Sequence, residues 1–218
     1  PNKPFSHQKN LYSDRAFYFI TVGGSGKRIA TQMPPSAASL TATSFDERFF
    51  HELDSVNFLA SGKEWFGEEL SSLPGRSLSK TLSLPLPDIL PGQARLITSV
   101  AARSVGADSR FTITANNQLV QQIAVPPIGT SQYDLFARQV QKEDQFVLNQ
   151  GLGSLNFTYT PGSFNSQGWL NWAEFFCRRN LVLPQSQQLT FRDWNSLNRP
   201  AVQFNLTATA GAQVWDVT

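Results

Sequence analysis

One thiol and two imidazoles are the side chains best suited to nucleophilic catalysis in this sequence: Cys177, His7 and His51. A cysteine peptidase needs a partly exposed thiol beside a histidine that can take its proton. Read as a strand, the chain places Cys177 on the same face as Ala173 and Phe175, where cysteine usually serves as a small hydrophobic core residue. We therefore expect no catalytic residue in this chain and a buried, slowly reacting Cys177. Two histidines so far apart in sequence also give no zinc-binding spacing.

Acidic residues occur in pairs that could serve hydrolysis or bind a cation. Glycoside hydrolysis requires two carboxyl groups at a fixed separation, which sequence spacing does not give. Calcium accepts oxygen ligands from irregular loops, so Glu52 and Asp54 are the candidate ligands of a calcium site. Because most such pairs are solvated, we expect no metal or other cofactor and keep calcium as the alternative. The pairs are Glu52 and Asp54, Glu64 and Glu68, and Glu143 and Asp144.

Three tryptophans, Trp65, Trp194 and Trp215, could form a platform on which sugar rings stack, as aromatic faces do in carbohydrate-binding sandwiches. Core packing is the competing role, and we expect it for at least two of the three. Trp65 lies between Gly62 and Gly67, and glycine lets a backbone come close to a sheet. The sequence therefore predicts that Trp65 anchors this turn onto the rest of the fold.

The scaffold for these side chains is organised around residues 169–181, the densest run of large apolar side chains in the chain. Both faces of the run are largely apolar when it is read with a period of two, which predicts a central strand covered on both sides. A helix is the alternative, because a partial helical stripe is also present, but the aromatic content favours a strand. The two predicted strand faces are Leu170, Trp172, Glu174, Phe176 and Arg178 on one side, and Trp169, Ala173, Phe175 and Cys177 on the other.

Composition indicates a globular protein of the kind common outside the cytoplasm. The 218 residues suffice for one large all-β domain or two unequal pieces. Charged residues make up only 16% of the chain, against about a quarter in average proteins. The net charge is +2 and the 18 basic residues are scattered along the sequence, which argues against nucleic acid as a partner. No segment reaches the roughly 18 apolar residues that a membrane-spanning helix needs. We expect a piece of a longer polypeptide, because no signal peptide opens the chain and a predicted strand ends it.

Alternating apolar residues separated by turn residues predict about ten strands without helical patterns between them. This excludes a parallel sheet with crossover helices and predicts an all-β fold, a two-sheet antiparallel β-sandwich of jelly-roll type. We place the sandwich at residues 61–218. The predicted strands include residues 94–104, 111–115, 119–125, 133–148, 155–159, 189–191, 202–206 and 214–217, the last of them burying Trp215 and Val217.

Residues 1–60 are expected to form an N-terminal hairpin and an irregular arm that pack on the sandwich. The hairpin joins residues 15–22 to residues 27–30 through a glycine-rich turn. A phosphate-binding loop is excluded there, because Thr21 stands where the motif needs its first glycine. Residues 45–59 fit either a short helix or an extended arm, and spacing alone does not decide between them.

Several motifs, in the same order, resemble the region ahead of the peptidase domain in the PorU family, the gingipain-like cysteine peptidases (sortases) of the Bacteroidetes type IX secretion system. The most specific are Ser-Gly-Lys-Glu-Trp-Phe-Gly-Glu at residues 61–68 and Val-Trp-Asp-Val-Thr at residues 214–218. The resemblance implies structural motif positions at Trp65, Gly67, Glu68, Trp172 and Trp215. The other matching segments are Asn-Leu-Tyr-Ser-Asp at 10–14, Phe-Tyr-Phe at 17–19, Gly-Lys-Arg-Ile at 26–29, Glu-Leu-Asp-Ser-Val-Asn at 52–57 and the aromatic run at 169–181.

The resemblance also implies a function for the whole polypeptide: removal of the C-terminal secretion signal from cargo, with attachment to an anionic lipopolysaccharide. In that family the catalytic His and Cys lie downstream of the position where this chain stops, so none is carried onto it. The chain is then an accessory β-sandwich at the cell surface, on the outer membrane, that supports a downstream caspase-like catalytic domain. Its other expected partners are secreted cargo, secretion-system proteins or lipopolysaccharide. A carbohydrate-binding module is the alternative from a different class.

Overall fold

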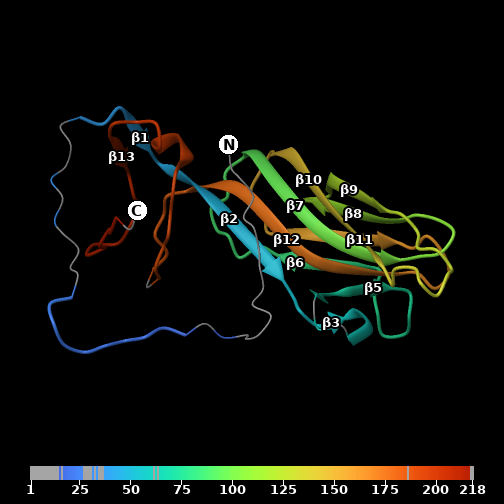
Figure 1. Ribbon diagram of the computed structural model, residues 1–218. Helices are drawn as coiled ribbons and strands as arrows, with labels where there is room; N and C mark the ends of the chain where they lie inside the picture. The colour runs from blue at the N-terminus through green and yellow to red at the C-terminus, as the bar shows by residue number, and fades with distance from the viewer. Residues whose placement is uncertain are drawn as a thin grey trace.

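Two antiparallel β-sheets packed face to face form the body of the chain (Figure 1). The computed structural model describes residues 15, 17–26, 31, 33, 37–60, 62, 64–185 and 187–216. The larger sheet has the order β10-β7-β12-β2, with β5 also paired to β12, and the smaller sheet has the order β6-β11-β8-β9. The larger sheet contains β2 (Ser44–Glu52), β5 (Glu69–Ser71), β7 (Gly92–Arg103), β10 (Arg138–Leu148) and β12 (Gln167–Asn180), and the smaller sheet contains β6 (Ser79–Ser83), β8 (Ser109–Ala115), β9 (Gln118–Val125) and β11 (Ser154–Thr160).

The connections between these strands are those of a jelly roll. Apart from the β8–β9 hairpin, each successive strand from β6 to β12 crosses to the opposite sheet. Two antiparallel layers linked in this way, here of five and four strands, have the jelly-roll architecture. The predicted all-β sandwich is therefore confirmed. β12 lies between β7 and β2 in the larger sheet, which confirms residues 169–181 as part of a central strand and excludes the helix.

Alternating burial builds the core between the sheets. In β11, Leu155, Phe157 and Tyr159 are buried while the residues between them are exposed. Phe111 of β8 points inward in the same way, and each large apolar side chain buried in this manner contributes about 1.5 to 3 kcal/mol. Gly168 lets β12 come close to the smaller sheet, because a Cβ there would lie 2.7 Å from side-chain atoms of both Phe111 and Tyr159.

A β-bulge between Leu170 and Trp172 changes which side chains of β12 face the core. A bulge inserts one extra residue and so shifts the alternation of the strand by one position. Leu170 therefore joins the main core, while Trp169 belongs to a separate aromatic cluster. The predicted faces are wrong for these two residues, which exchange sides, and right for Ala173, Phe175 and Cys177, which lie together in the main core.

Small strand pairs lie at the two ends of β2 (Figure 1). Beyond its C-terminal end, β3 (Val56–Asn57) pairs with β4 (Trp65–Phe66), and the short turn η1 (Phe58–Ala60) lies between them. Before its N-terminal end, β1 (Leu40–Ala42) pairs in parallel with β13 (Val202–Phe204). The ring of Phe191 lies 6.3 Å from that of Phe45 and 5.3 Å from that of Phe204, so an aromatic contact joins this end to the sheet.

The predicted arm contains a strand of the sandwich. Residues 44–52, which were ambiguous in sequence, form β2 and pair with nine residues of β12. Long-range pairing resolves the ambiguity, because β2 pairs along its whole length with the edge of β12. This part of residues 1–60 therefore belongs to the larger sheet.

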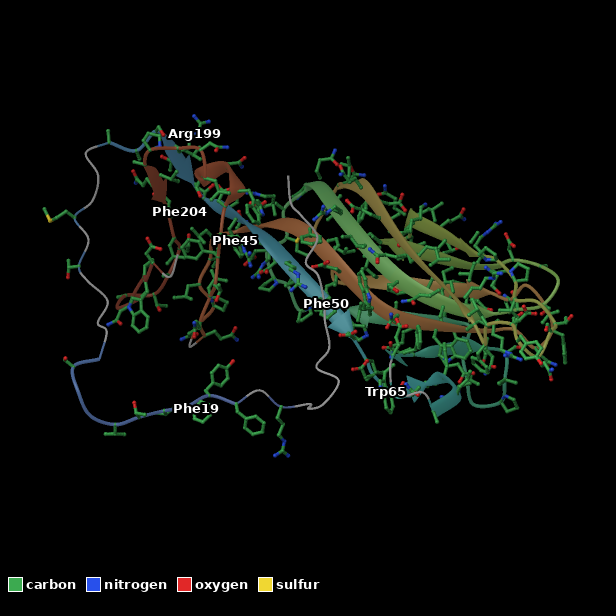
Figure 2. All side chains as sticks on the ribbon, in the orientation of Figure 1. Phe19, Phe45, Phe50, Trp65, Arg199 and Phe204 are labelled. Carbon is green, nitrogen blue, oxygen red and sulfur yellow. The ribbon has the colours of Figure 1, made fainter. Side chains whose placement is uncertain are left out.

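The described part of the predicted N-terminal hairpin contains no strand. Residues 17–26 carry no strand pairing, and Phe17 and Phe19 are 76% and 100% exposed. Figure 2 shows Phe19 away from the two sheets. The prediction that residues 15–22 form the first strand of a hairpin is therefore wrong for the described residues. The predicted second strand, residues 27–30, lies outside the described residues. An isolated β-hairpin is only marginally stable in water. A segment with alternating apolar residues therefore forms a hairpin only where it can pack on a sheet.

The predicted C-terminal strand is also wrong. Residues 212–216 contain no strand, Trp215 is 64% exposed, and Val217 lies outside the described residues. Residues 189–191 form no strand either, and β13 takes only three residues. Short alternations match a strand pattern easily but do not specify a partner. Within the part of the chain that the structure describes, no helix is long and apolar enough to cross a membrane.

Candidate functional site

A network of charged residues joins β12 to η2 (Trp194–Ser196), the short turn near the β1–β13 end. Arg178 donates a hydrogen bond of 2.7 Å to Asp193 and lies 3.2 Å from Asp46, and it also donates to the backbone and hydroxyl oxygens of Ser44. Burial alone would lower the pKa of Arg178, but the hydrogen bond to Asp193 and the charge of Asp46 raise it overall. Its charge is therefore compensated within the fold.

The same aspartates hold the turn in place. The side chain of Asp193 accepts from the backbone N–H of Asn195 at 3.1 Å, as an N-cap residue does. The side chain of Asp46 accepts from the backbone N–H of Trp194 at 2.8 Å. η2 is thus bonded at its first residues to both β2 and its own cap, so the indole of Trp194 projects from a fixed backbone.

A groove with a volume of about 850 Å³ lies between residues 193–199, which include this turn, and residues 40–44, which run from β1 into β2 and are called the β1–β2 segment. Its volume falls within the range of small-molecule sites. The floor includes Arg178 and Asp193, and the rim carries the exposed side chains of the turn and of the β1–β2 segment. The rim residues are Thr41, Thr43, Trp194, Asn195, Leu197, Asn198 and Arg199.

A second polar cluster lies near the opposite end of β2. His51 is 3.0 Å from Glu68, and Lys80 is 3.5 Å from the same carboxylate. Burial alone would raise the pKa of Glu68, but the hydrogen bond from His51 and the charges of His51 and Lys80 lower it overall. This arrangement ties β2 to β6 through a carboxylate and contains no nucleophile.

Cys177 is not available for catalysis. Its side chain lies in the main core and only 6% of the residue is exposed. Burial, followed by the nearby charge of Glu47, raises the pKa of the thiol to about 12. A thiol in this state forms almost no thiolate at neutral pH. The predicted burial of Cys177 is confirmed, and His7, the other histidine besides His51, lies outside the described residues.

Phe66, and not the predicted Trp65, anchors the turn that contains residues 62–68. Phe66 is 4% exposed and stacks on Phe58 with 4.3 Å between ring centroids, whereas Trp65 is 37% exposed. Gly67 allows the close approach expected of it: a Cβ there would lie 2.7 Å from the carbonyl oxygen of Leu170. The prediction for Trp65 is therefore corrected, because β4 turns Phe66 rather than Trp65 toward the aromatic cluster.

The three tryptophans do not form one platform. Trp65 lies beyond the C-terminal end of β2, whereas Trp194 is bonded to Asp46 near its N-terminal end, so at least six residues of β2 separate them, about 20 Å at the usual rise. Figure 2 shows Arg199, which is near Trp194 in sequence, beyond the other end of β2 from Trp65. Trp172 lies on β12 and its ring is 6.2 Å from that of Phe50. Only Trp194 lines the groove.

The candidate calcium ligands are both on the surface. Glu52 and Asp54 are exposed, and no group of three or more histidine, cysteine, aspartate or glutamate residues that could hold a metal ion occurs within the described residues. The residues around the groove were not identified from sequence, apart from Trp194. The signal available was the Asp193-Trp-Asn-Ser sequence, in which an aspartate precedes a short turn as a cap.

The sequence matches no protein-family model and no curated protein. Among solved structures, the chain is similar to dimeric latent PorU from Porphyromonas gingivalis, with a TM-score of 0.62, 16% identity, and coverage of 78% of this chain and 16% of that one. This likeness supports a shared fold over the region. The chain thus spans about a sixth of the PorU chain it matches.

Two carbohydrate-binding modules are also similar over less than half of the chain. One is the C-terminal module of LamC, a laminarinase from Zobellia galactanivorans, with a TM-score of 0.30, 13% identity, and coverage of 44% of this chain and 70% of that one. The other is a module of lichenase 5A from Cellvibrio mixtus in complex with cellotriose, with a TM-score of 0.27, 16% identity, and coverage of 44% and 63%. Similarity at this level carries no argument about function.

Proposed function

We propose that this chain is a non-catalytic β-sandwich module of a larger gingipain-like cysteine peptidase that processes type IX secretion cargo. In this proposal the sandwich supports a caspase-like catalytic domain that follows Thr218 in the same polypeptide. The whole protein removes C-terminal signals from cargo and attaches the cargo to anionic lipopolysaccharide at the cell surface. Cargo proteins, secretion-system proteins and lipopolysaccharide are the proposed partners.

The observation that carries this proposal is the match of 78% of the chain to part of PorU at a TM-score of 0.62. The sequence motifs between residues 10 and 218 resemble the same family. At 16% identity the structural likeness concerns the fold, so the role is our inference from the two together.

The environment of Cys177 supports a non-catalytic role. A nucleophilic thiol requires a base within hydrogen-bond reach and a depressed pKa. Cys177 is buried and its pKa is raised to about 12. The described imidazole, that of His51, is bound to Glu68, and His51 pairs with Ala173, four residues from Cys177 along β12. In this proposal, peptidase activity comes from another domain of the same polypeptide.

The proposal is tested by the coding sequence beyond residue 218 and by activity. We expect the reading frame to continue into a caspase-like domain with its own histidine and cysteine. The longer polypeptide should cleave a cargo substrate carrying a C-terminal signal, and Cys177→Ala should leave that cleavage intact. A stop codon directly after Thr218, or thiol-dependent cleavage by the 218-residue chain that Cys177→Ala abolishes, would refute the proposal.

A further inference from the structure

The groove beside η2 combines the features that proteins use to bind sugars. It is open to solvent on its rim, which is formed by exposed residues of the turn and of the β1–β2 segment, and its volume is about 850 Å³. Oligosaccharides are bound by flat aromatic rings together with side chains that donate and accept hydrogen bonds. Both kinds of group meet in this groove.

The aromatic element is Trp194. Its residue is 38% exposed, and its backbone N–H is bonded to Asp46, so the ring is presented by a fixed turn. The guanidinium of Arg192 lies 5.9 Å from the centre of the indole. A partly exposed indole held rigidly offers apolar area at a small cost in conformational entropy, which suits stacking against the C–H face of a sugar ring.

The polar elements are Asn195, Asn198 and Arg199, whose side chains are exposed on the same rim. Within the described part of the chain, none of these three side chains makes a hydrogen bond or an ion pair. An asparagine amide can donate and accept at once, and a guanidinium can donate two parallel hydrogen bonds. Such groups match neighbouring hydroxyls on a sugar, or a carboxylate on an acidic sugar.

The charged side chains at the floor of the groove already form ion pairs with one another. Arg178 is paired with Asp193 and Asp46, so it is not free to recruit an anion. Recognition therefore falls to the indole, the two amides and Arg199. We propose that this groove binds an oligosaccharide, with one sugar ring on Trp194 and its hydroxyl groups on Asn195, Asn198 and Arg199. This inference is independent of the proposed accessory role, and either can fail without the other.

Titration of the 218-residue chain with defined hexasaccharides tests the proposal. Laminarihexaose and cellohexaose represent neutral chains, and hexagalacturonate represents an acidic one. We expect saturable binding of at least one of the three by calorimetry. Trp194→Ala should weaken that binding at least tenfold. Trp65→Ala is the matched control, because Trp65 is exposed to nearly the same extent, 37%, but lies at the far end of β2, and it should leave the affinity unchanged.

Two further variants separate binding from folding and neutral from acidic ligands. Asn198→Ala changes an exposed side chain and should weaken binding about threefold or more while the melting temperature stays constant. Arg199→Ala should reduce affinity for hexagalacturonate more than for the neutral chains if the acidic chain is bound. Absence of binding to all three hexasaccharides at millimolar concentration would overturn the proposal, as would equal losses in Trp194→Ala and Trp65→Ala.

Discussion

Arg178 donates a hydrogen bond of 2.7 Å from its Nη1 to Oδ1 of Asp193, and this contact joins the C-terminal part of β12 to the N-cap of η2. Asp193 is nearly buried, with 3% of its side chain exposed, while 29% of the Arg178 side chain is exposed. Asp193 also caps η2, so one carboxylate positions both the guanidinium and the turn that carries Trp194. The groove depends on this pair.

The first prediction concerns that carboxylate. Asp193→Ala should lower the free energy of unfolding by about 1 to 3 kcal/mol, because the cap is lost and Arg178 loses one of its two carboxylate partners. The loss should be smaller than for a fully buried pair, since Arg178 is partly solvated. Denaturant unfolding measures it. Asp193→Asn keeps the capping oxygen but loses the charge, so it should lose less stability than Asp193→Ala. Equal losses in the two variants would contradict a contribution from the cap, and no loss in Asp193→Asn would contradict a contribution from the charge.

The second prediction is a pH dependence at Glu68. Its pKa in the folded state is lowered by His51 and Lys80, against the effect of burial. A carboxylate with a depressed folded pKa adds stability that is fully present above its unfolded pKa of about 4.5 and is lost as the pH falls through the folded pKa. The stability advantage of wild type over Glu68→Gln should therefore shrink as the pH falls below roughly 4.5.

Denaturant titrations between pH 3 and pH 7 provide this measurement. Glu64→Gln is the matched control, because Glu64 is an exposed residue in the same turn. It should alter stability by less than about 0.5 kcal/mol at every pH. A wild-type advantage over Glu68→Gln that grows on acidification would show that the sign is wrong.

The third prediction is that Cys177 resists thiol reagents in the folded state. Burial raises the pKa of the thiol to about 12, so little thiolate forms at pH 8 and the reagent cannot reach the sulfur. Labelling with a maleimide should be slow without denaturant and complete in guanidinium chloride. The Cys177→Ala variant contains no thiol and measures the background labelling. Rapid labelling of the native chain would place the thiol at the surface.

The fourth prediction compares two glycines. At Gly67, an added Cβ would lie 2.7 Å from the carbonyl oxygen of Leu170 and 2.8 Å from that of Leu53, so backbone would have to move. Gly67→Ala should cost about 1 to 3 kcal/mol, as overpacking does. Nothing lies within 4 Å of a Cβ at Gly153, so Gly153→Ala should be neutral or slightly stabilising. Thermal melts that rank the two variants the other way would contradict this.

The fifth prediction distinguishes Phe66 from Trp65 as the anchor of their turn. Phe66 is 4% exposed in the aromatic cluster with Phe58 and Trp169, and its loss should cost about 3 to 5 kcal/mol. Trp65→Ala should cost less than Phe66→Ala, because more than a third of Trp65 already faces water whereas Phe66 is almost fully buried. Melting curves of the two alanine variants provide the comparison. A larger loss of stability in Trp65→Ala than in Phe66→Ala would show that Trp65 is the anchor, as the sequence predicted.

Much of the sandwich was predictable because strand patterns are local. The alternation in β8, β9 and β11 is visible in sequence, and each segment forms a strand with bounds close to those expected. Turn residues between such segments exclude crossover helices, which is enough to specify an antiparallel all-β fold. The burial of Cys177 followed from its neighbours, Ala173 and Phe175, on one strand face.

Errors arose wherever a strand pattern lacked a partner or a strand was irregular. Residues 17–22 and 214–216 alternate as strands do, yet the structure pairs neither with a sheet. The bulge before Trp172 moved Trp169 out of the main core, because one extra residue reverses the alternation and no local signal marked it.

Taken alone, the sequence determined the fold class, the central strand and the lack of a reactive thiol, because each depends on the period and polarity of neighbouring residues. Only the tertiary structure decided the site. Arg178, Asp193 and Asp46 come from three separate segments, and the groove beside Trp194 exists because β2 and β12 bring those segments to the same end of the larger sheet. Contacts between residues more than a hundred positions apart depend on strand pairing and register, which local patterns do not encode.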